Sequence, residues 1–572
     1  MTRRAPTERL TVGQALVRFL ASQRVERDGV ERPFFAGVFG IFGHGNVAGI
    51  GQALRPYADR LPYHMARNEQ SMVHIASGYA KQRNRLATFA CTSSIGPGAT
   101  NMVTGAATAT VNRLPVLLLP SDVFATRVAS PVLQELEDPR GYDVSVNDAF
   151  RPLSRFFDRV WRPEQLPAAL LGAMRVLTDP AETGAVTVCL PQDVQAEAYD
   201  FPESLFAKRV WHVGRPVPEP AALARAAEVI RAAERPLIVA GGGVIYAEAA
   251  PELDALSRAT GIPVADTHAG KGAVRWDHPN SVGGIGSTGT PVANRLAREA
   301  DVVIGIGTRY SDFTTASHTA FQHPGVRFVN VNVASFDAAK HSATSVVADA
   351  REATAALTAV IGRTWERSWA GDVADWQRTV DEAYHAGHGP LPSQAEVIGA
   401  VNDACGERDV VVQAAGSMPG DLQLLWRARD PKQYHVEYGY SCMGFEIAGA
   451  LGIKLADPTR EVYALVGDGS YLMMAQELVT AVAEGVKLIV VLVQNHGFAS
   501  IGALSESLGS QRFGTSYRYR TGDDYGGDRL PVDLAANAES LGAAVIRCRT
   551  VADLTEGLKQ ARESDRLTVV HI

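Results

Sequence analysis

Short runs of β-branched and other apolar residues recur along the chain, and longer Ala-rich segments separate them. This alternation is typical of α/β domains, in which helices join parallel strands. Many of the runs contain no polar residue, as expected for strands that are buried on both faces of a sheet. The sequence therefore predicts an α/β fold of mainly parallel sheets with helices on both faces of each sheet.

The apolar runs form three groups, separated by two segments rich in Pro, Gly and charge at roughly 197–220 and 362–392. A chain of 572 residues is long enough for three or four domains at about 150 residues each. We predict domains at 1–195, 215–365 and 390–572. The runs expected to be strands are 114–120, 185–191, 236–243, 301–308, 327–333, 409–417, 461–470, 487–495 and 567–572.

Composition excludes several classes of partner. The net charge is −7 and the Lys and Arg residues are scattered, so no basic face predicts binding to nucleic acid or to a membrane surface. No apolar run is long enough to span a bilayer, and the N-terminal residues lack the apolar core of a secretion signal. The five cysteines form no CxxC pair, which is typical of reduced thiols. We expect a cytoplasmic protein.

Polar residues follow two neighbouring strands of the third predicted domain. Asp468 follows the run 462–466, and Asn495 and Gly497 follow the run 488–493, one strand–helix–strand unit later. Parallel strands end at the same edge of a sheet, so these residues should lie close together. A carboxylate, an amide oxygen and the Gly497 carbonyl are the kind of oxygen ligands that Mg²⁺ takes when it also holds a phosphate.

The residues around Asp468 support a diphosphate beside the metal. Gly467 and Gly469 allow a close approach of the backbone, and Ser470 lies at the start of a helix expected over 472–484. A GDG sequence alone would more often be a tight turn after a strand. The second strand, ending in Asn-x-Gly at this spacing, favours the ligand site.

The strings GDGS (467–470) and QNHGF (494–498) resemble the cofactor motif of the thiamine-diphosphate superfamily that includes acetolactate synthases and pyruvate decarboxylases. The resemblance implies bound thiamine diphosphate and Mg²⁺, with Asp468, Asn495 and Gly497 as metal ligands. It also implies cofactor contacts from Gly467, Gly469 and Ser470. Gln494 departs from the Asn or Asp that is usual before the second ligand.

A second pair of strings carries the resemblance into the first domain. RNEQSMVHIASGYAK (67–81) resembles the superfamily's glutamate helix, and SIGPGATN (94–101) resembles its glycine-rich turn. The resemblance implies that Glu69 is catalytic and hydrogen-bonds the cofactor's aminopyrimidine ring from another subunit. A homodimer or homotetramer with active sites at the subunit interface follows. A lone Glu in a first helical turn would otherwise be a surface residue stabilised by the helix dipole.

Two further residues match positions near the cofactor. The string YGYSCMGF (438–445) resembles the loop whose bulky apolar side chain bends the cofactor, and Met443 takes that position. A Met is also a common core filler. Ser417, after the run 409–417, stands where the superfamily has a polar residue near the cofactor.

The middle domain contains the string GIGSTG at 284–289, which reads GxGxxG. No apolar run precedes it, so we expect no strand there and no dinucleotide site. The stretch 286–294 is similar to the superfamily's central domain, which binds FAD in some members. We expect no flavin here.

Several strings resemble bacterial trihydroxycyclohexane-1,2-dione hydrolases of myo-inositol catabolism. They lie at 39–51, 122–127, 147–149, 416–422 and 435–441. The resemblance implies hydrolytic C–C cleavage of a cyclic polyhydroxy dione to 5-deoxy-glucuronate. His44 is the candidate catalytic residue in the first loop, although a loop-packing role is equally compatible with its sequence context. Asn46, Asp122 and Arg127 are the other polar candidates to line the substrate pocket.

Two other functions remain open at this point. One is an acetolactate-synthase-like lyase or transferase that acts on 2-keto acids, and the other is a non-catalytic relative that only binds the cofactor. Intact Glu69, Asp468 and Asn495 argue against the non-catalytic relative. The loop around His44 favours the dione hydrolase over the synthase.

Overall fold

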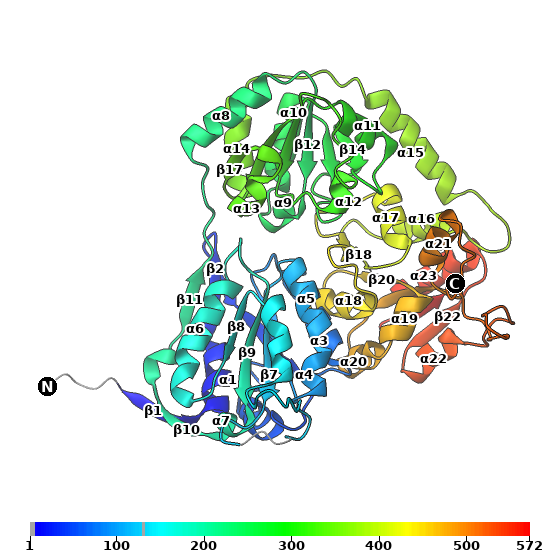
Figure 1. Ribbon diagram of the computed structural model, residues 1–572. Coiled ribbons are helices and arrows are strands. Elements are labelled where there is room, and N and C mark those ends of the chain that lie inside the picture. Colours follow the sequence, from blue (N-terminus) through cyan, green and yellow to red (C-terminus); the bar gives the residue numbers. More distant parts are fainter. Residues whose placement is uncertain (1–5, 128–131) are drawn as a thin grey trace. The chain divides into compact units, whose positions relative to one another are not determined.

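The computed structural model describes residues 6–127 and 132–572. The chain divides into two compact units, which are described separately. The first contains the residues up to 214 together with 448–457 and 476–486. The second contains 215–447, 458–475 and 487–572. Sheets flanked by helices make up both units (Figure 1), which confirms the predicted α/β fold.

The first unit is built on a six-stranded sheet whose strands all run parallel. Its order is β5 (Tyr63–Met65), β4 (Phe35–Gly40), β6 (Thr88–Ser93), β7 (Val116–Asp122), β9 (Ala185–Pro191) and β8 (Phe156–Arg159). Every residue of β7 is buried. Leu117 and Leu119 share a core cluster with helices α1 (Val12–Ser22) and α6 (Leu166–Leu177), whereas Leu118 points to the opposite face. Both faces of this strand are therefore covered.

The order of this sheet contains a topological switch point. The chain passes from β4 outward to β5 and then returns to β6 on the other side of β4. The loops that follow β4 and β6 therefore flank the position at the carboxyl edge where α/β sheets bind ligands. The loop of His44 and the glycine-rich turn at 94–101 are these two loops.

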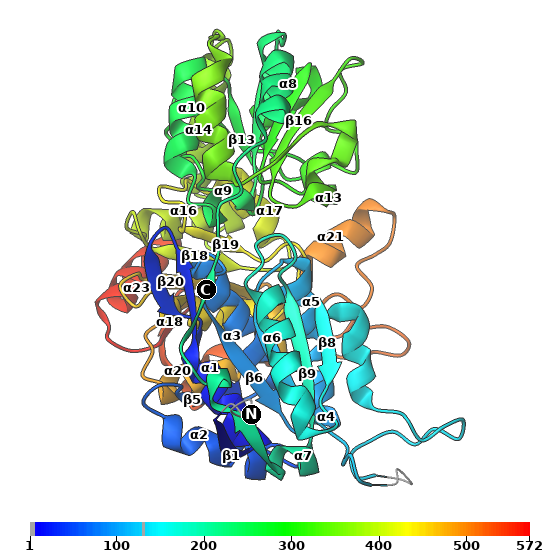
Figure 2. The same cartoon turned by 90° about the vertical axis from the view of Figure 1, so that its left-hand side faces the viewer.

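The second unit holds two six-stranded parallel sheets. The central sheet has the order β14 (Ser281–Gly284), β13 (Val264–Asp266), β12 (Pro236–Ala240), β15 (Val302–Ile306), β16 (Arg327–Asn332) and β17 (Thr344–Val347). Counted along the chain this is the 3-2-1-4-5-6 order of dinucleotide-binding domains. Figure 2 shows α8 (Pro220–Arg231), α10 (Ala250–Thr260) and α14 (Ala350–Ile361) around it.

The GxGxxG string of the central sheet corrects one expectation. A strand does precede it, because β14 ends at the first glycine, Gly284. Its sequence, SVGG, has a single β-branched residue and so carries almost no strand signal. The helix that follows, α11, begins only at Pro291, after Thr290 accepts a hydrogen bond from the amide of Ala293. The string is therefore not the tight strand-to-helix turn of a dinucleotide site.

The C-terminal sheet has the order β19 (Tyr434–Val436), β18 (Val410–Gln413), β20 (Val462–Gly467), β21 (Ile489–Val493), β23 (Thr568–His571) and β22 (Ala544–Arg547). Counted along the chain, this is the same order as that of the N-terminal sheet. Its switch point lies between β18 and β20. The loops after these strands carry Ser417 and Asp468, so the predicted cofactor residues lie where such a sheet binds ligands.

The prediction of a single helix over 472–484 is wrong. The structure has α19 (Asp468–Met474) and α20 (Glu477–Ala483). Helix α19 begins at once after β20 because Gly467, in an extended conformation, serves as its N-cap. The break falls where the chain passes from the second unit to the first. There the buried Glu477 accepts a hydrogen bond from the amide of Arg67.

The two segments expected to be linkers contain regular elements. The first includes β10 (Ala198–Pro202) and β11 (Arg209–His212), which pair with N-terminal strands. The second includes the helix α15 (Ala370–Tyr384). Among the described residues, no helix combines the length and the apolar character needed to cross a membrane.

Candidate functional site

Four loops of the C-terminal sheet carry the predicted cofactor residues. They follow β18, β19, β20 and β21, which are neighbouring parallel strands. Because parallel strands end at one edge of the sheet, the loops gather there. Their site residues are Ser417, Met443, Gly467, Asp468, Gly469, Ser470, Asn495 and Gly497.

The side chains of Asp468 and Asn495 and the carbonyl group of Gly497 converge where the sequence predicts a metal. The side-chain amide of Asn495 lies 3.3 Å from Oδ1 of Asp468 and 2.8 Å from the carbonyl oxygen of Gly497, and either end of this amide can face the two oxygens. Without a cation, the amide would turn so that its NH₂ group donates to both oxygens. With a cation at the usual distance of about 2.1 Å, adjacent octahedral ligands stand about 3.0 Å apart. The arrangement fits a small divalent cation.

Burial and backbone hydrogen bonds hold the carboxylate of Asp468 in place. The residue is 1% exposed, and Oδ2 accepts a hydrogen bond from the amide of Gly497 at 3.1 Å. Burial raises the pKa of this carboxyl, and the backbone amides around it act in the opposite direction. Gly497 has a φ of 152°, and a Cβ there would lie 2.3 Å from the carbonyl oxygen of Thr515. Only glycine fits the position that supplies the third oxygen.

The side chain of Gln494, which departs from the superfamily pattern, forms hydrogen bonds away from the three candidate ligands. Its Oε1 lies 2.6 Å from Nε2 of His571 in β23, and its Nε2 donates to the carbonyl oxygen of Val532 at 3.4 Å. The side chain therefore ties β21 to its neighbouring strand. The departure leaves the three candidate ligands untouched.

Met443 lies against the metal loop. A Cβ added at Gly469 would stand 3.1 Å from Cε of Met443 and 2.9 Å from the ring of Phe498. Glycine is thus required where the two side chains close over the loop. Met443 is only partly buried. A partly exposed apolar side chain at this edge fits the predicted wedge better than simple core filling.

The two serines of the site differ in their surroundings. Ser470 is buried, and its hydroxyl hydrogen-bonds the carboxylate of Glu446. Ser417 is exposed at the start of α17 (Met418–Leu425), and its hydroxyl donates to Oε1 of Gln394 at 2.9 Å. The hydroxyl of Ser470 therefore stabilises its own loop through Glu446, whereas the side chain of Ser417 is accessible to a ligand.

Glu69 occupies the first position of α3 (Glu69–Gln82) in the first unit. The helix begins there because the side chain of Asn68 accepts hydrogen bonds from the amides of Gln70 and Ser71. The Glu69 side chain is largely buried, and its Oε2 accepts a hydrogen bond from Nδ2 of Asn101 at 3.0 Å. The carboxylate is thus fixed by the glycine-rich turn.

The glycine-rich turn leaves room for this carboxylate. A Cβ at Gly98 would lie 3.0 Å from Oε1 of Glu69 and 2.3 Å from Oγ of Ser94. The loop of His44 joins the same turn, because the amide of Ile95 donates to the carbonyl oxygen of His44 at 3.0 Å. The side chain of His44 is exposed. The structure therefore brings Glu69, the turn and the His44 loop together.

Two other candidates for the substrate pocket have structural partners instead. Asn46 is fully buried, and its amide group bonds the amide of Gly43 and the carbonyl oxygen of Ile41 within its own loop. Asp122 is fully buried against Arg159 at 2.6 Å and Ser145 at 2.7 Å. The expectation that these two side chains line a pocket is not supported. His44 and Arg127 remain exposed.

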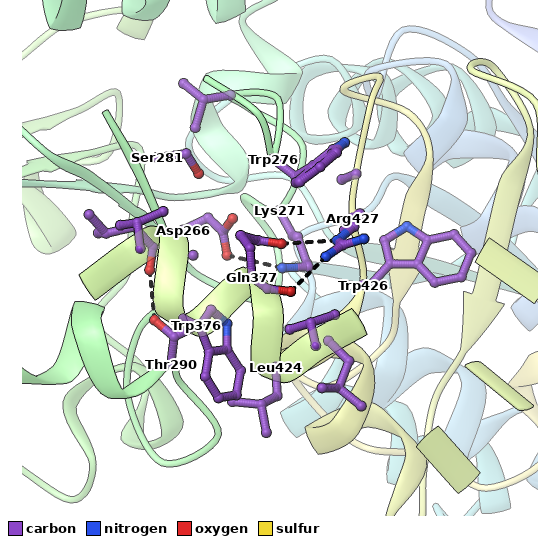
Figure 3. A pocket seen from close by; sticks show the side chains of 17 residues that line it. Asp266, Lys271, Trp276, Ser281, Thr290, Trp376, Gln377, Leu424, Trp426 and Arg427 are labelled. Carbon is purple, nitrogen blue, oxygen red and sulfur yellow. Dashed lines mark hydrogen bonds and ion pairs between the residues drawn. The ribbon is translucent and has the colours of Figure 1, made fainter. Parts of the chain in front are cut away.

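The small cavity of Figure 3 is separate from these loops. It has a volume of about 30 Å³, which is room for a water or two. Asp266 and Lys271, both buried, point toward each other beside it at 3.8 Å, and Lys271 donates to the carbonyl oxygen of Gln423 at 2.9 Å. Burial raises the pKa of Asp266 and lowers that of Lys271. This pair is a packing feature of the second unit.

Three family models match the chain in order. They are described as the N-terminal thiamine pyrophosphate binding domain (residues 10–140), the central domain (223–357) and the C-terminal thiamine pyrophosphate binding domain (414–572) of thiamine pyrophosphate enzymes. The chain belongs to the thiamine pyrophosphate enzyme family. The N-terminal binding model includes Glu69 and the glycine-rich turn, and the C-terminal binding model includes Asp468 and Asn495.

Curated members of the family are similar to the chain over nearly its whole length. The 3D-(3,5/4)-trihydroxycyclohexane-1,2-dione hydrolase of Bacillus cereus (strain AH820) is 47% identical over 597 residues, which cover 99% of this chain and 93% of that protein. The hydrolases of Bacillus thuringiensis (strain Al Hakam) and Bacillus anthracis have the same identity and coverage. The resemblance found in the sequence is thereby confirmed.

The residues that hold the site residues in place could not be identified from the sequence. Asn101 lies within the glycine-rich turn, but only the structure shows its bond to Glu69. Glu446 and Glu437 bind loop amides beside Met443. The available signal was a charged residue among apolar and small ones in MGFEIAGALG, at 443–452.

Proposed function

We propose that this chain hydrolyses trihydroxycyclohexane-1,2-dione to 5-deoxy-glucuronate, using thiamine diphosphate and Mg²⁺. The observation that carries the proposal is the 47% identity to curated dione hydrolases over 99% of the chain. The family also includes lyases and transferases that share the cofactor, so cofactor binding alone would not select the substrate. The loop geometry supports the cofactor part of the proposal independently.

Mg²⁺ would be held by Asp468, Asn495 and the carbonyl oxygen of Gly497. The convergence of these three groups supports this assignment. One carboxylate with two neutral oxygens leaves charge on the metal for a diphosphate, which is how Mg²⁺ is commonly shared with phosphate groups. The backbone of Gly467, Gly469 and Ser470 would contact the diphosphate, because the hydroxyl of Ser470 is bonded to Glu446.

Thiamine diphosphate, when bound, supplies a carbon nucleophile and an electron sink for C–C cleavage. Glu69 would hydrogen-bond the aminopyrimidine ring and move a proton at that ring. Asn101 would keep the carboxylate in place, as it does in this structure. Met443 would support the bent cofactor from the loop after β19, and Ser417 would offer a hydroxyl from the loop after β18.

His44 would serve the substrate. Its side chain is exposed in a loop that is bonded to the glycine-rich turn beside Glu69. A neutral imidazole both donates and accepts hydrogen bonds, which suits a ring that presents hydroxyls and carbonyls. Arg127, exposed and 3.9 Å above the ring of Phe124, is a second candidate to contact the substrate.

The assembly would be a homodimer or homotetramer with active sites at the subunit interface. Large apolar side chains are exposed next to the metal loop, and these are Leu472 and Met473 in α19 and Ile501, Leu504 and Leu508 in or directly after α21 (Ala499–Ser507). Exposed apolar groups of this kind are typical of protein interfaces. The five cysteines are free and buried, which suits the cytoplasmic location that we propose.

The domain assignment is part of the same proposal. Residues 1–195 would bind the pyrimidine ring, 215–365 would form a central domain without a bound flavin, and 390–572 would bind the diphosphate and metal. The three sheets lie within these ranges. The matched family domains do as well.

Product analysis tests the proposed reaction. The purified protein with Mg²⁺ and thiamine diphosphate is incubated with the cyclic dione, and the products are identified by NMR and mass spectrometry. Formation of 5-deoxy-glucuronate that requires both additions supports the proposal. If the dione is unchanged while pyruvate is converted to acetolactate, the chain is a synthase-like enzyme instead.

A further inference from the structure

A carboxylate with no assigned role lies among the loops of the cofactor site. Glu446 is the second residue of α18 (Phe445–Ala456), and it is fully buried. Its neighbours Phe445 and Ile447 are buried apolar residues. A buried carboxylate is costly unless several donors satisfy it, so its presence at this position requires an explanation.

Glu446 accepts hydrogen bonds from three separate loops. Its Oε1 accepts from the amide of Ala415 at 3.4 Å, and its Oε2 accepts from the amide of Gly444 at 3.0 Å. The hydroxyl of Ser470 is the third donor. These donors belong to the loops after β18, β19 and β20, which are the loops of Ser417, Met443 and Asp468.

The bonding pattern requires an acceptor at both oxygens. Two of the donors are backbone amides, which cannot reverse their role, and they reach different oxygens of the carboxylate. An amide side chain of the same shape would turn its NH₂ group toward one of these N–H groups. The interaction would then be lost on that side and a buried donor would remain unsatisfied.

The loop between β19 and α18 is held from a second direction as well. The buried Glu437 accepts hydrogen bonds from the amides of Tyr440 and Cys442, each at 2.8 Å. Within the loop, Ser441 and Gly444 have φ values of 54° and 92°. A loop with two left-handed residues is not set by local preference alone, so the two carboxylates determine its path.

We propose that Glu446 is a positioning residue that fixes Met443, the Ser417 loop and the metal loop relative to one another. That these loops bind the cofactor and the metal rests on the proposed function, whereas the hydrogen bonds of Glu446 are independent of it. Burial raises the pKa of Glu446 to about 7, and its backbone and Ser470 hydrogen bonds lower it.

The opposing explanation is that Glu446 stabilises only the start of α18. A carboxylate in the first turn of a helix is favourable at any site in the chain. Glu396 offers a matched control in the same unit. It is 3% exposed, lies in the first turn of α16 (Gln394–Ala404), and accepts hydrogen bonds from the amides of Ser393 and Gly387 in a capping box. Because the neighbouring Gln394 contacts Ser417, the control is compared at the loop 439–445.

The test compares Glu446→Gln with Glu396→Gln by deuterium exchange of the full chain without cofactor. We expect amide exchange at 414–418 and 439–445 to rise about tenfold in the Glu446 variant and to stay unchanged at 439–445 in the control. Calorimetry then measures the Kd of thiamine diphosphate in the presence of Mg²⁺. We expect it to rise by about tenfold or more for Glu446→Gln and by less than twofold for the control.

The outcomes separate the inference from the proposed function. Unchanged exchange in both loops, or faster exchange with an unchanged Kd, overturns the positioning role. Equal changes in the control variant overturn it too. If the unmodified chain binds no thiamine diphosphate, the proposed function fails, while the exchange data still decide whether Glu446 holds the loops. If Glu446→Gln does not fold, Glu446→Asp, which keeps two acceptors on a shorter arm, takes its place with the same expected changes.

Discussion

At the scale of single residues, the assignment of a metal site depends most on Asp468. Replacing it with Asn removes the only carboxylate among the three converging groups. We expect the Mg²⁺-dependent affinity for thiamine diphosphate to fall by about 10² or more, since even the partners behind metal ligands contribute 10–100-fold. Calorimetry with and without Mg²⁺ measures this. The exposed Asp375→Asn in α15 is the control, and equal affinities in the two variants would disprove the assignment.

Glu69 is the residue that we assign to proton transfer at the cofactor. Glu69→Gln retains the shape of the side chain and its contact with Asn101. Cofactor affinity should therefore stay within about tenfold, whereas turnover should fall by about 10² or more, as expected when a proton-transfer group is removed. NMR of the exchange of the cofactor's C2 proton provides a direct measurement. A variant that exchanges this proton at the unmodified rate contradicts the role of Glu69.

At the scale of elements, the glycine-rich turn should control the place of the Glu69 carboxylate. Gly98→Ala introduces a Cβ 2.3 Å from Oγ of Ser94 and 3.0 Å from Oε1 of Glu69. Both are ends of side chains, so we expect the protein to fold and the carboxylate to shift. Turnover should fall at least tenfold, with the melting temperature changed by only a few degrees. Gly141→Ala, where a Cβ meets nothing within 4 Å, should leave both unchanged.

Helix α3 should also make stability depend on pH. Burial lowers the pKa of His74 to about 3, below its ordinary value of 6.5. Below pH 6.5 the unfolded chain binds a proton there that the folded chain does not, so stability falls as the pH falls, by up to about 1.4 kcal/mol per pH unit. Thermal unfolding between pH 7.5 and 5.5 should show a smaller decrease for His74→Gln than for the unmodified chain.

The exposed His388→Gln controls for the loss of an imidazole in this experiment. An unchanged pH dependence in the His74 variant would mean that other groups cause the acid sensitivity. Candidates are the buried His278 and the partly buried His571, because burial lowers the pKa of both.

Elements with a strong local pattern could be predicted from the sequence. The run 185–191 coincides with β9, because seven buried positions in succession leave little choice between strand and loop. Strand β14 could not be predicted, since two of its four residues are glycines and its pairing with β13 defines it. The break between α19 and α20 coincides with a change of packing partners, which no local pattern records.

Some residues of the candidate site could be predicted from the sequence and others could not. Asp468 and Asn495 follow recognisable strands, so spacing alone placed them together. The burial of Asp122 depends on Arg159 and Ser145, which lie far along the chain, and the sequence does not reveal that neighbourhood. The role of Glu446 likewise depends on three loops that meet only in the folded sheet.

At the scale of the whole molecule, we expect the enzyme to select a polyhydroxylated ring as its substrate. A site built to bind several hydroxyls leaves buried polar groups unpaired when a simple keto acid enters, and such sites reject the lesser substrate by about 10⁴. His44→Ala should accordingly lower kcat/KM for the dione by tenfold or more and leave cofactor affinity nearly unchanged. A variant that loses both equally would place His44 in cofactor binding instead.

The ratio of two specificity constants tests the hydrolase assignment. Steady-state kinetics of one preparation, saturated with Mg²⁺ and thiamine diphosphate, give kcat/KM for dione hydrolysis and for acetolactate formation from pyruvate. We predict that the value for the dione exceeds that for pyruvate by about 10⁴. A specificity constant for pyruvate equal to or above that for the dione would contradict the hydrolase assignment and favour the synthase-like alternative.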